Sequence, residues 1–116
     1  MSGSPRQLPD DGAGSRWELP ADFLLSVVMP VYNEEATIRE ILRRVAAVPM
    51  RKEIVVVDDG STDDTRRLLG ELEAEGLPGS EPWGNHLRVV YQAVNQGKGA
   101  ALRVGFAAAS GDVVVV

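Results

Sequence analysis

Four short, largely apolar runs divide the chain, at positions 24–29, 53–57, 87–91 and 113–116. The runs at 53–57 and 113–116 are continuous, which is typical of strands buried on both faces of a parallel sheet. Pro30 closes the first run, because a proline cannot donate to a central hydrogen-bond ladder. The pattern therefore predicts four strands of one sheet.

A helix is predicted directly after the first strand. Asn33 is suited to cap its N-terminus, since a short polar side chain can accept from free helical N–H groups. Glu34 and Glu35 suit the positive end of the helix dipole. The apolar residues at helical spacing are Ile38, Ile41, Leu42 and Val45.

Two more helices are predicted after the second and third strands. Ser61 and Asp64 have the spacing of a capping box at the start of the second helix. Segment 76–85, with two prolines and three glycines, predicts a surface connection. A third helix, rich in small residues, is predicted at 99–109 and should pack closely on the sheet. The apolar residues that follow the capping box at helical spacing are Leu68, Leu69 and Leu72.

Strands and helices alternate along the whole chain. Parallel strands joined by helices make right-handed crossovers in almost all cases, so the pattern predicts a Rossmann-like, doubly wound α/β sheet with helices on both faces. In the common strand order 3-2-1-4, the crevice at the reversal is lined by the loops after the first and fourth strands. Residues 30–34 would face that crevice, so the carboxyl edge of the sheet is the predicted site.

The length allows one domain at most, since the chain has 116 residues. Residues 1–22 are rich in Gly, Pro, Ser and Asp, which predicts a disordered tail. Residues 23–116 form the predicted folded part. The valine run at 113–116 stops with no turn or covering element after it, so we expect the chain to be the front part of a larger domain.

Composition narrows the classes of function. The net charge of -5 argues against a nucleic-acid or anionic-membrane surface. The absence of cysteine excludes disulfides, thiolate metal sites and a cysteine nucleophile, and His86 has no second histidine with which to hold zinc. No window reaches the roughly 18 continuous apolar residues that a membrane-spanning helix needs, so we expect a cytoplasmic location.

Three polar motifs follow the first three strands: residues 30–35 (PVYNEE), 58–63 (DDGSTD) and 95–100 (NQGKGA). Asp58 and Asp59 end a buried strand just before a glycine, so we expect both carboxylates at the rim of the sheet. A carboxylate only accepts hydrogen bonds, from a base N–H, ribose hydroxyls or a hydrated cation. Alternatively, one aspartate caps the turn into the next helix.

Aromatic and charged side chains in the other two motifs suit a nucleotide. Tyr32 could stack on a planar base, and Glu34 could accept from a base or a sugar hydroxyl. Alternatively, Tyr32 covers the sheet edge and Glu34 serves the helix dipole. Lys98 lies between Gly97 and Gly99 at a helix start, where free N–H groups favour phosphate, although a solvated loop is an equal alternative.

Taken together, the motifs resemble a known family. Residues 25–116 are similar to the nucleotide-binding half of a family-2 glycosyltransferase with the GT-A fold, in motif order and in approximate spacing. Within the family, they look most like the branch of dolichyl-phosphate mannosyltransferases and polyprenyl-phosphate glucosyltransferases. The resemblance implies transfer of a sugar from a UDP- or GDP-sugar to an acceptor such as a polyprenyl phosphate.

The resemblance also implies roles for individual residues. Asp58 would support the residues that bind the nucleotide, and Lys98 would lie near the phosphates. No catalytic residue is expected within the chain. The residues implied to hold the base and ribose of the nucleotide-sugar are Pro30, Tyr32, Glu34, Val57 and Asp59.

A metal is implied as well. In the family, a D-x-D motif follows the strand that matches 113–116, and its aspartates bind Mg²⁺ or Mn²⁺. The cation stabilises charge that builds on the leaving diphosphate. We expect this motif, and the acceptor site, after Val116. The 116-residue chain alone would then be inactive, and the full enzyme would lie at the cytoplasmic membrane face.

Three other readings compete with a glycosyltransferase. An NAD-binding oxidoreductase needs a glycine fingerprint after the first strand, where this chain has residues 30–34 (PVYNE), and a nucleotidyltransferase needs a basic glycine-rich loop there. Neither feature is present. The third reading is a non-catalytic fragment that binds nucleotide, or packs with a partner that completes the sheet at the apolar edge 113–116.

Overall fold

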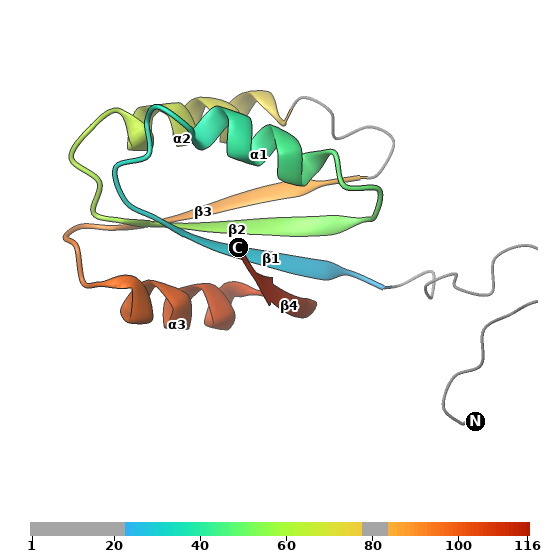
Figure 1. The fold of residues 1–116 in the computed structure, drawn as a ribbon. Helices are drawn as coiled ribbons and strands as arrows, with labels where there is room; N and C mark the ends of the chain where they lie inside the picture. Colours follow the sequence, from blue (N-terminus) through green and yellow to red (C-terminus); the bar gives the residue numbers. More distant parts are fainter. Residues whose placement is uncertain (1–22, 78–83) are drawn as a thin grey trace, which may run out of the picture.

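A computed structural model describes residues 23–77 and 84–116. The predicted disordered tail, 1–22, and most of the predicted connection at 76–85 lie outside the described residues. The described part contains the four predicted strands and the three predicted helices in the predicted order (Figure 1).

The four strands are parallel and form one sheet in the order β3-β2-β1-β4. They are β1 (Leu25–Val31), β2 (Lys52–Asp59), β3 (His86–Gln92) and β4 (Asp112–Val115). The order in which strands are added to the sheet reverses at β1. The chain places β2 and then β3 on one side of β1, and β4 on its other side. The parallel α/β class predicted from the sequence is confirmed, and the strand order is the common order 3-2-1-4.

Helices cover both faces of the sheet (Figure 1). Helices α1 (Ile38–Ala46) and α2 (Thr65–Glu75) lie on one face, and α3 (Lys98–Ala108) lies on the other. The core is divided in the same way, because successive side chains of a strand point to opposite faces. In β2, Ile54 and Val56 pack with α1 and α2, whereas Val55 and Val57 pack with α3.

Helix α3 lies very close to the sheet, as its small residues predict. A Cβ atom added at Gly105 would lie 2.4 Å from Val28 Cγ1 and 3.3 Å from Val57 Cγ2. Both valines are fully buried, so the backbone of α3 at Gly105 rests directly on their side chains. This contact fixes the distance of α3 from the sheet and, through it, the position of the first turn of the helix.

Two predictions at the first strand are wrong. Pro30 does not close the strand but lies inside β1, which continues to Val31. The missing N–H does not interrupt the ladder with β2, because the backbone groups of Pro30 point to the side of β4, as does the Val28 carbonyl, which accepts from the Val116 N–H. Asn33 is not the N-cap of α1 either, since that position is Thr37 and Asn33 lies in the preceding turn with a φ of 52°.

The predicted capping box before α2 is also wrong. The N-cap of α2 is Asp64, which makes no side-chain cap hydrogen bond. The Ser61 hydroxyl instead accepts from the backbone N–H of Asn33, at 2.9 Å. Hydrogen bonds between two loops have thus replaced the local cap that the spacing indicated.

Two charged side chains are buried at the amino edge of the sheet. The Lys52 ammonium, on a residue only 1% exposed, donates to the carbonyls of Ala46, Val48 and Met50 at 2.7 to 3.1 Å. Burial lowers the pKa of Lys52. These bonds satisfy carbonyls at the C-terminal end of α1 and in the turn that follows it.

The other buried charge, Glu53, lies on the opposite face. Its carboxylate accepts from the Ser26 hydroxyl and from both the N–H and the hydroxyl of Ser110, all through Oε2. Burial by itself raises the pKa of Glu53, but these donors outweigh it and the pKa lies below its usual range. Glu53 thereby ties the start of β4 to the two central strands.

Strand β4 is present as predicted, but it is not buried on both faces. Its valines are 42 to 44% exposed, and Val116 is 58% exposed. Only β1 pairs with β4 among the strands that the structure describes. In the described ranges, no helix is long and apolar enough to cross a membrane.

Candidate nucleotide-sugar site

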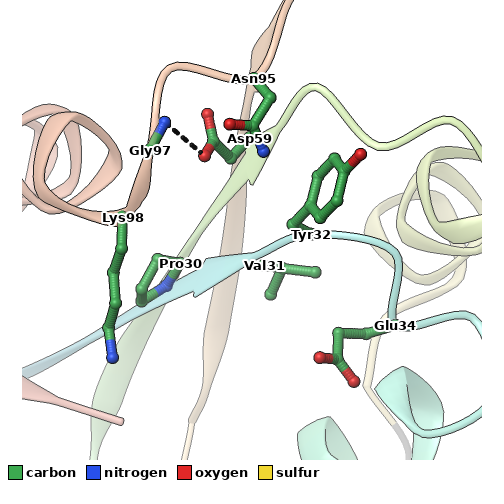
Figure 2. A pocket seen from close by; sticks show the side chains of 8 residues that line it. All are labelled: Pro30, Val31, Tyr32, Glu34, Asp59, Asn95, Gly97 and Lys98. Atoms are coloured by element: carbon green, nitrogen blue, oxygen red, sulfur yellow. Dashed lines mark hydrogen bonds between the residues drawn. The ribbon is translucent and has the colours of Figure 1, made fainter.

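A cavity of about 280 Å³ lies at the carboxyl edge of the sheet (Figure 2). One wall comes from the end of β1 and the turn after it, and another from the segment that leads into α3. The end of β2 lies between them. Figure 2 shows the residues that line the cavity, which are Pro30, Val31, Tyr32, Glu34, Asp59, Asn95, Gly97 and Lys98.

The turn after β1 is fastened to the turn after β2 by four hydrogen bonds of Asn33, which we call the Asn33 bridge. The Asn33 N–H donates to the Ser61 hydroxyl at 2.9 Å, and its side-chain Nδ2 donates to the Thr62 hydroxyl at 3.3 Å. Its Oδ1 accepts from the N–H groups of Thr62 and Asp63, at 2.8 and 3.3 Å. The left-handed φ of Asn33, which asparagine tolerates well, brings these groups together.

Glu34 and Glu35 continue the connection between the same two turns. The Glu34 N–H donates to the Thr65 hydroxyl at 2.8 Å, and Glu35 Oε1 accepts from the Asp64 N–H at 2.8 Å. The Glu34 carboxylate itself accepts from the Thr37 hydroxyl at 2.8 Å and lines the cavity. The Tyr32 ring is 44% exposed on this firmly held turn, which leaves it accessible to a ligand.

Asp59 connects the end of β2 to the opposite wall. It is 3% exposed, and its Oδ1 and Oδ2 accept from the backbone N–H groups of Gln96 and Gly97 at 2.8 and 3.0 Å. Gly97 is the N-cap of α3, and Lys98 begins the helix with an exposed side chain. The free N–H groups of this first turn, together with the ammonium, make this wall attractive to an anion.

Asp58 points to the other face of the sheet and is fully buried. Its Oδ2 accepts from Arg66 Nε at 2.9 Å and from the Ser61 N–H at 3.3 Å, whereas Oδ1 has no hydrogen-bond partner. The Arg66 guanidinium also stacks over the Tyr91 ring, 5.1 Å from its centroid. The prediction that both aspartates lie at the rim is therefore wrong for Asp58, whereas Asp59 does line the cavity at the carboxyl edge of the sheet.

Five of the seven residues predicted to bind the nucleotide-sugar line the cavity: Pro30, Tyr32, Glu34, Asp59 and Lys98. Val57 and Asp58 do not, since Val57 packs under α3 and Asp58 under α2. Sequence reasoning missed three lining residues, Val31, Asn95 and Gly97. Asn95 and Gly97 belong to the third motif, so their position after a strand was the available signal.

No group of three or more His, Asp or Glu side chains gathers to suit a metal ion within 23–77 and 84–116. Of the carboxylates in the cavity, Asp59 already accepts two N–H groups and Glu34 accepts a hydroxyl. The described residues therefore do not form a site for Mg²⁺ or Mn²⁺ by themselves.

Comparison with known proteins shows the family. Residues 26–116 match the sequence family described as "Glycosyl transferase family 2". The chain belongs to this family. The resemblance stated from the motifs is thereby confirmed for the family, and the matched region contains every strand of the sheet except the first residue of β1.

Curated relatives of this family-2 chain are named as undecaprenyl-phosphate transferases of a modified arabinose. The chain is 37% identical over 95 residues to the undecaprenyl-phosphate 4-deoxy-4-formamido-L-arabinose transferase of Klebsiella pneumoniae, covering 78% of this chain and 27% of that protein. It is 41% identical over 96 residues to the protein of the same name from Pseudomonas aeruginosa, covering 79% and 26%. The chain thus spans about a quarter of the length of these relatives.

A solved structure shares the fold. The crystal structure of S. aureus TarS 1-349 superposes with a TM-score of 0.66 at 30% identity, covering 81% of this chain and 27% of that one. This similarity supports the α/β class that the strand order indicates.

Proposed function

We propose that this family-2 domain binds a UDP- or GDP-linked sugar in the cavity at the carboxyl edge of its sheet. The observation that carries the proposal is the combination of groups around one cavity of about 280 Å³. An accessible aromatic ring, a carboxylate and an ammonium at a helix start correspond to a base, sugar hydroxyls and phosphates. Open α/β sheets bind ligands at this edge.

Three of the lining residues contact the nucleotide-sugar through polar or aromatic groups in the proposal. Tyr32 stacks on the base, and Glu34 accepts from a hydroxyl or a base N–H. Lys98 lies near the phosphates, where the first turn of α3 adds N–H donors. Val57 and Asp58 act from below the cavity, because neither lines it.

The proposed reaction transfers the sugar to a polyprenyl phosphate. The names of the Klebsiella and Pseudomonas relatives, which are undecaprenyl-phosphate transferases, support a lipid-phosphate acceptor. The full enzyme would then work at the cytoplasmic face of a membrane. A lipid acceptor also fits a domain in which the sugar donor enters from the aqueous phase.

We further propose that Mg²⁺ or Mn²⁺ serves the full enzyme through a D-x-D motif after Val116, and that the 116 residues alone do not catalyse transfer. A divalent cation would neutralise charge on the leaving diphosphate. Reading the gene beyond the Val116 codon tests the motif. Sugar transfer by the 116-residue chain, assayed with UDP-glucose or GDP-mannose, Mg²⁺ and undecaprenyl phosphate, would contradict the second statement.

Nucleotide binding is tested by titration calorimetry of the chain with UDP, GDP, UDP-glucose and GDP-mannose. We expect saturable binding of one nucleotide, weakened about tenfold or more by Tyr32→Ala, since stacking on a base contributes about 1–3 kcal/mol. Phe106→Ala is the matched control, because Phe106 is 46% exposed and does not line the cavity. An equal loss of nucleotide affinity in both variants, or no binding of any nucleotide at millimolar concentration, would refute the proposal.

One observation favours a second function. The exposed valines of β4 suit a non-catalytic unit that binds nucleotide and packs with a partner along this edge. Sedimentation analysis of the chain with and without nucleotide measures its oligomeric state and so distinguishes this second function from the first. A monomer at all concentrations argues against the pairing function.

A further inference from the structure

The loop from β3 to α3 is joined to the sheet through one carboxylate. Asp59 Oδ1 accepts from the Gln96 N–H at 2.8 Å and Oδ2 from the Gly97 N–H at 3.0 Å. Both oxygens of a side chain that is 3% exposed are therefore engaged by consecutive N–H groups of this loop. Hydrogen bonds to an ionised acceptor are about twice as strong as neutral ones.

Gly60, the residue after Asp59, is in direct contact with the backbone of the same loop. A Cβ atom added at Gly60 would lie 2.4 Å from the Asn95 nitrogen and 2.5 Å from the Val94 carbonyl carbon. Gly60 also has a φ of 75°, which side chains rarely adopt. The end of β2 thus meets the loop through a backbone contact at Gly60 and through the paired hydrogen bonds of Asp59.

We propose that Asp59 is a positioning residue that holds the cavity wall formed by Asn95, Gly97 and Lys98. Its carboxylate fixes the loop, so that these three residues face a bound ligand in a set position; this role is additional to the contact with base and ribose that the resemblance implies for Asp59. The identity of that ligand as a nucleotide-sugar rests on the proposed function. The hydrogen bonds by which Asp59 holds the loop do not depend on the proposed function, because they are present in the ligand-free protein.

The neighbouring aspartate offers a matched control. Asp58 is as deeply buried as Asp59, but it pairs with Arg66 on the opposite face and does not line the cavity. Replacement of either aspartate by asparagine keeps its size. In Asp59→Asn, however, one oxygen becomes an NH₂ group that faces an N–H donor, so at least one of the two loop hydrogen bonds is lost.

Amide hydrogen exchange, followed by NMR on the ¹⁵N-labelled chain without ligand, tests the hold on the loop. We expect exchange of the Gln96 and Gly97 amides to become at least tenfold faster in Asp59→Asn and to stay unchanged in Asp58→Asn. The amides of Val55 and Val56 report whether the sheet remains folded. If Asp59→Asn does not fold, Asp59→Glu provides the same comparison, since its longer side chain keeps the charge but misplaces the oxygens.

A second variant separates positioning from direct contact. Gly60→Ala removes no group from the cavity, but its methyl group would clash with the backbone of Val94 and Asn95 and displace the loop, so both Gly60→Ala and Asp59→Asn should weaken binding of UDP or GDP about tenfold or more. Comparison of nucleotide affinity with amide exchange in the two variants therefore shows whether the position of the loop affects binding.

Two results would overturn the proposal. Protection of Gln96 and Gly97 that persists in Asp59→Asn would show that Asp59 does not hold the loop. A Gly60→Ala variant with fast loop exchange but normal nucleotide affinity would show that the position of the loop does not affect ligand binding. If the unaltered chain binds neither UDP nor GDP, the proposed function fails, and amide exchange alone still supports or overturns the hold on the loop.

Discussion

The contact of Gly105 with the sheet leads to the sharpest stability prediction. In Gly105→Ala the new methyl group would lie 2.4 Å from Val28 Cγ1 and 3.3 Å from Val57 Cγ2. Real Cβ atoms essentially never approach another carbon to less than 3.0 Å, so α3 or Val28 must move. Val28 is fully buried in a central strand and has a stiff, β-branched side chain, so neither movement is easy.

The magnitude follows from two opposing terms. Overpacking a core costs about 1–3 kcal/mol, and a contact this short at a stiff side chain belongs at the upper end of that range. Alanine in a helix interior recovers about 1 kcal/mol relative to glycine. We therefore expect Gly105→Ala to lower the free energy of unfolding by about 1–2 kcal/mol, which is about 1 M in the urea midpoint at a typical m-value.

Gly70 in α2 provides the matched control for the same substitution. A Cβ atom there would meet only the Tyr91 hydroxyl, at 3.8 Å, which is an ordinary contact. Gly70→Ala should consequently raise the free energy of unfolding by about 0.5–1 kcal/mol, through helix propensity and a less flexible unfolded chain. Urea titration followed by circular dichroism measures both variants, and a Gly105→Ala protein as stable as Gly70→Ala would refute the packing argument.

Three further predictions concern the buried charges. Because the pKa of Glu53 is below its usual 4.5 in the folded protein, the ionised carboxylate stabilises the fold fully above about pH 4.5, and this stabilisation is lost as the pH falls through the lower pKa of the folded state. Glu53→Gln should therefore flatten the dependence of the melting temperature on pH in that range. An unchanged slope would contradict this prediction. Arg66→Gln leaves the Asp58 carboxylate buried without its charged partner and should cost about 2–3 kcal/mol, somewhat less than for a fully buried pair because the Arg66 side chain is 38% exposed. Adding Asp58→Asn to Arg66→Gln should recover part of that loss in a double-mutant cycle, whereas simple additivity would count against the pair. Lys52→Met removes a donor to three backbone carbonyls, of which Ala46 and Val48 keep a second donor, and should lower the free energy of unfolding by about 1–3 kcal/mol. A thermal melt equal to that of the unaltered chain would refute the role of the ammonium.

The fold could be predicted from the sequence because its signals are local and repeated. The continuous apolar run of β2 and the alternation of strands and helices were enough to predict a parallel sheet with helices on both faces. Small residues in the third helix indicated close packing, and Gly105 is where that contact occurs. The position of the cavity followed, since the carboxyl ends of parallel strands share one edge.

What could not be predicted depends on contacts between distant segments. Asn33 and Ser61 both look like helix caps, yet 28 positions separate them in the chain and they bond to each other. Asp58 and Asp59 are adjacent and chemically identical, but alternation along β2 sends one to Arg66 and the other to Gln96. Spacing along the chain carries no information about which distant donor a side chain meets.

The Asn33 bridge also constrains how the protein can be re-engineered. Its four hydrogen bonds make residues 32–35 and 60–65 a single unit, so a specificity loop grafted from a relative should be exchanged as that pair of segments. The segment 93–97 is joined chiefly at Asp59 and Gly60, so it can be exchanged alone if those two residues are kept. If the proposed function holds, chimeric enzymes could thus vary the binding of base and of diphosphate independently, one half of the cavity at a time.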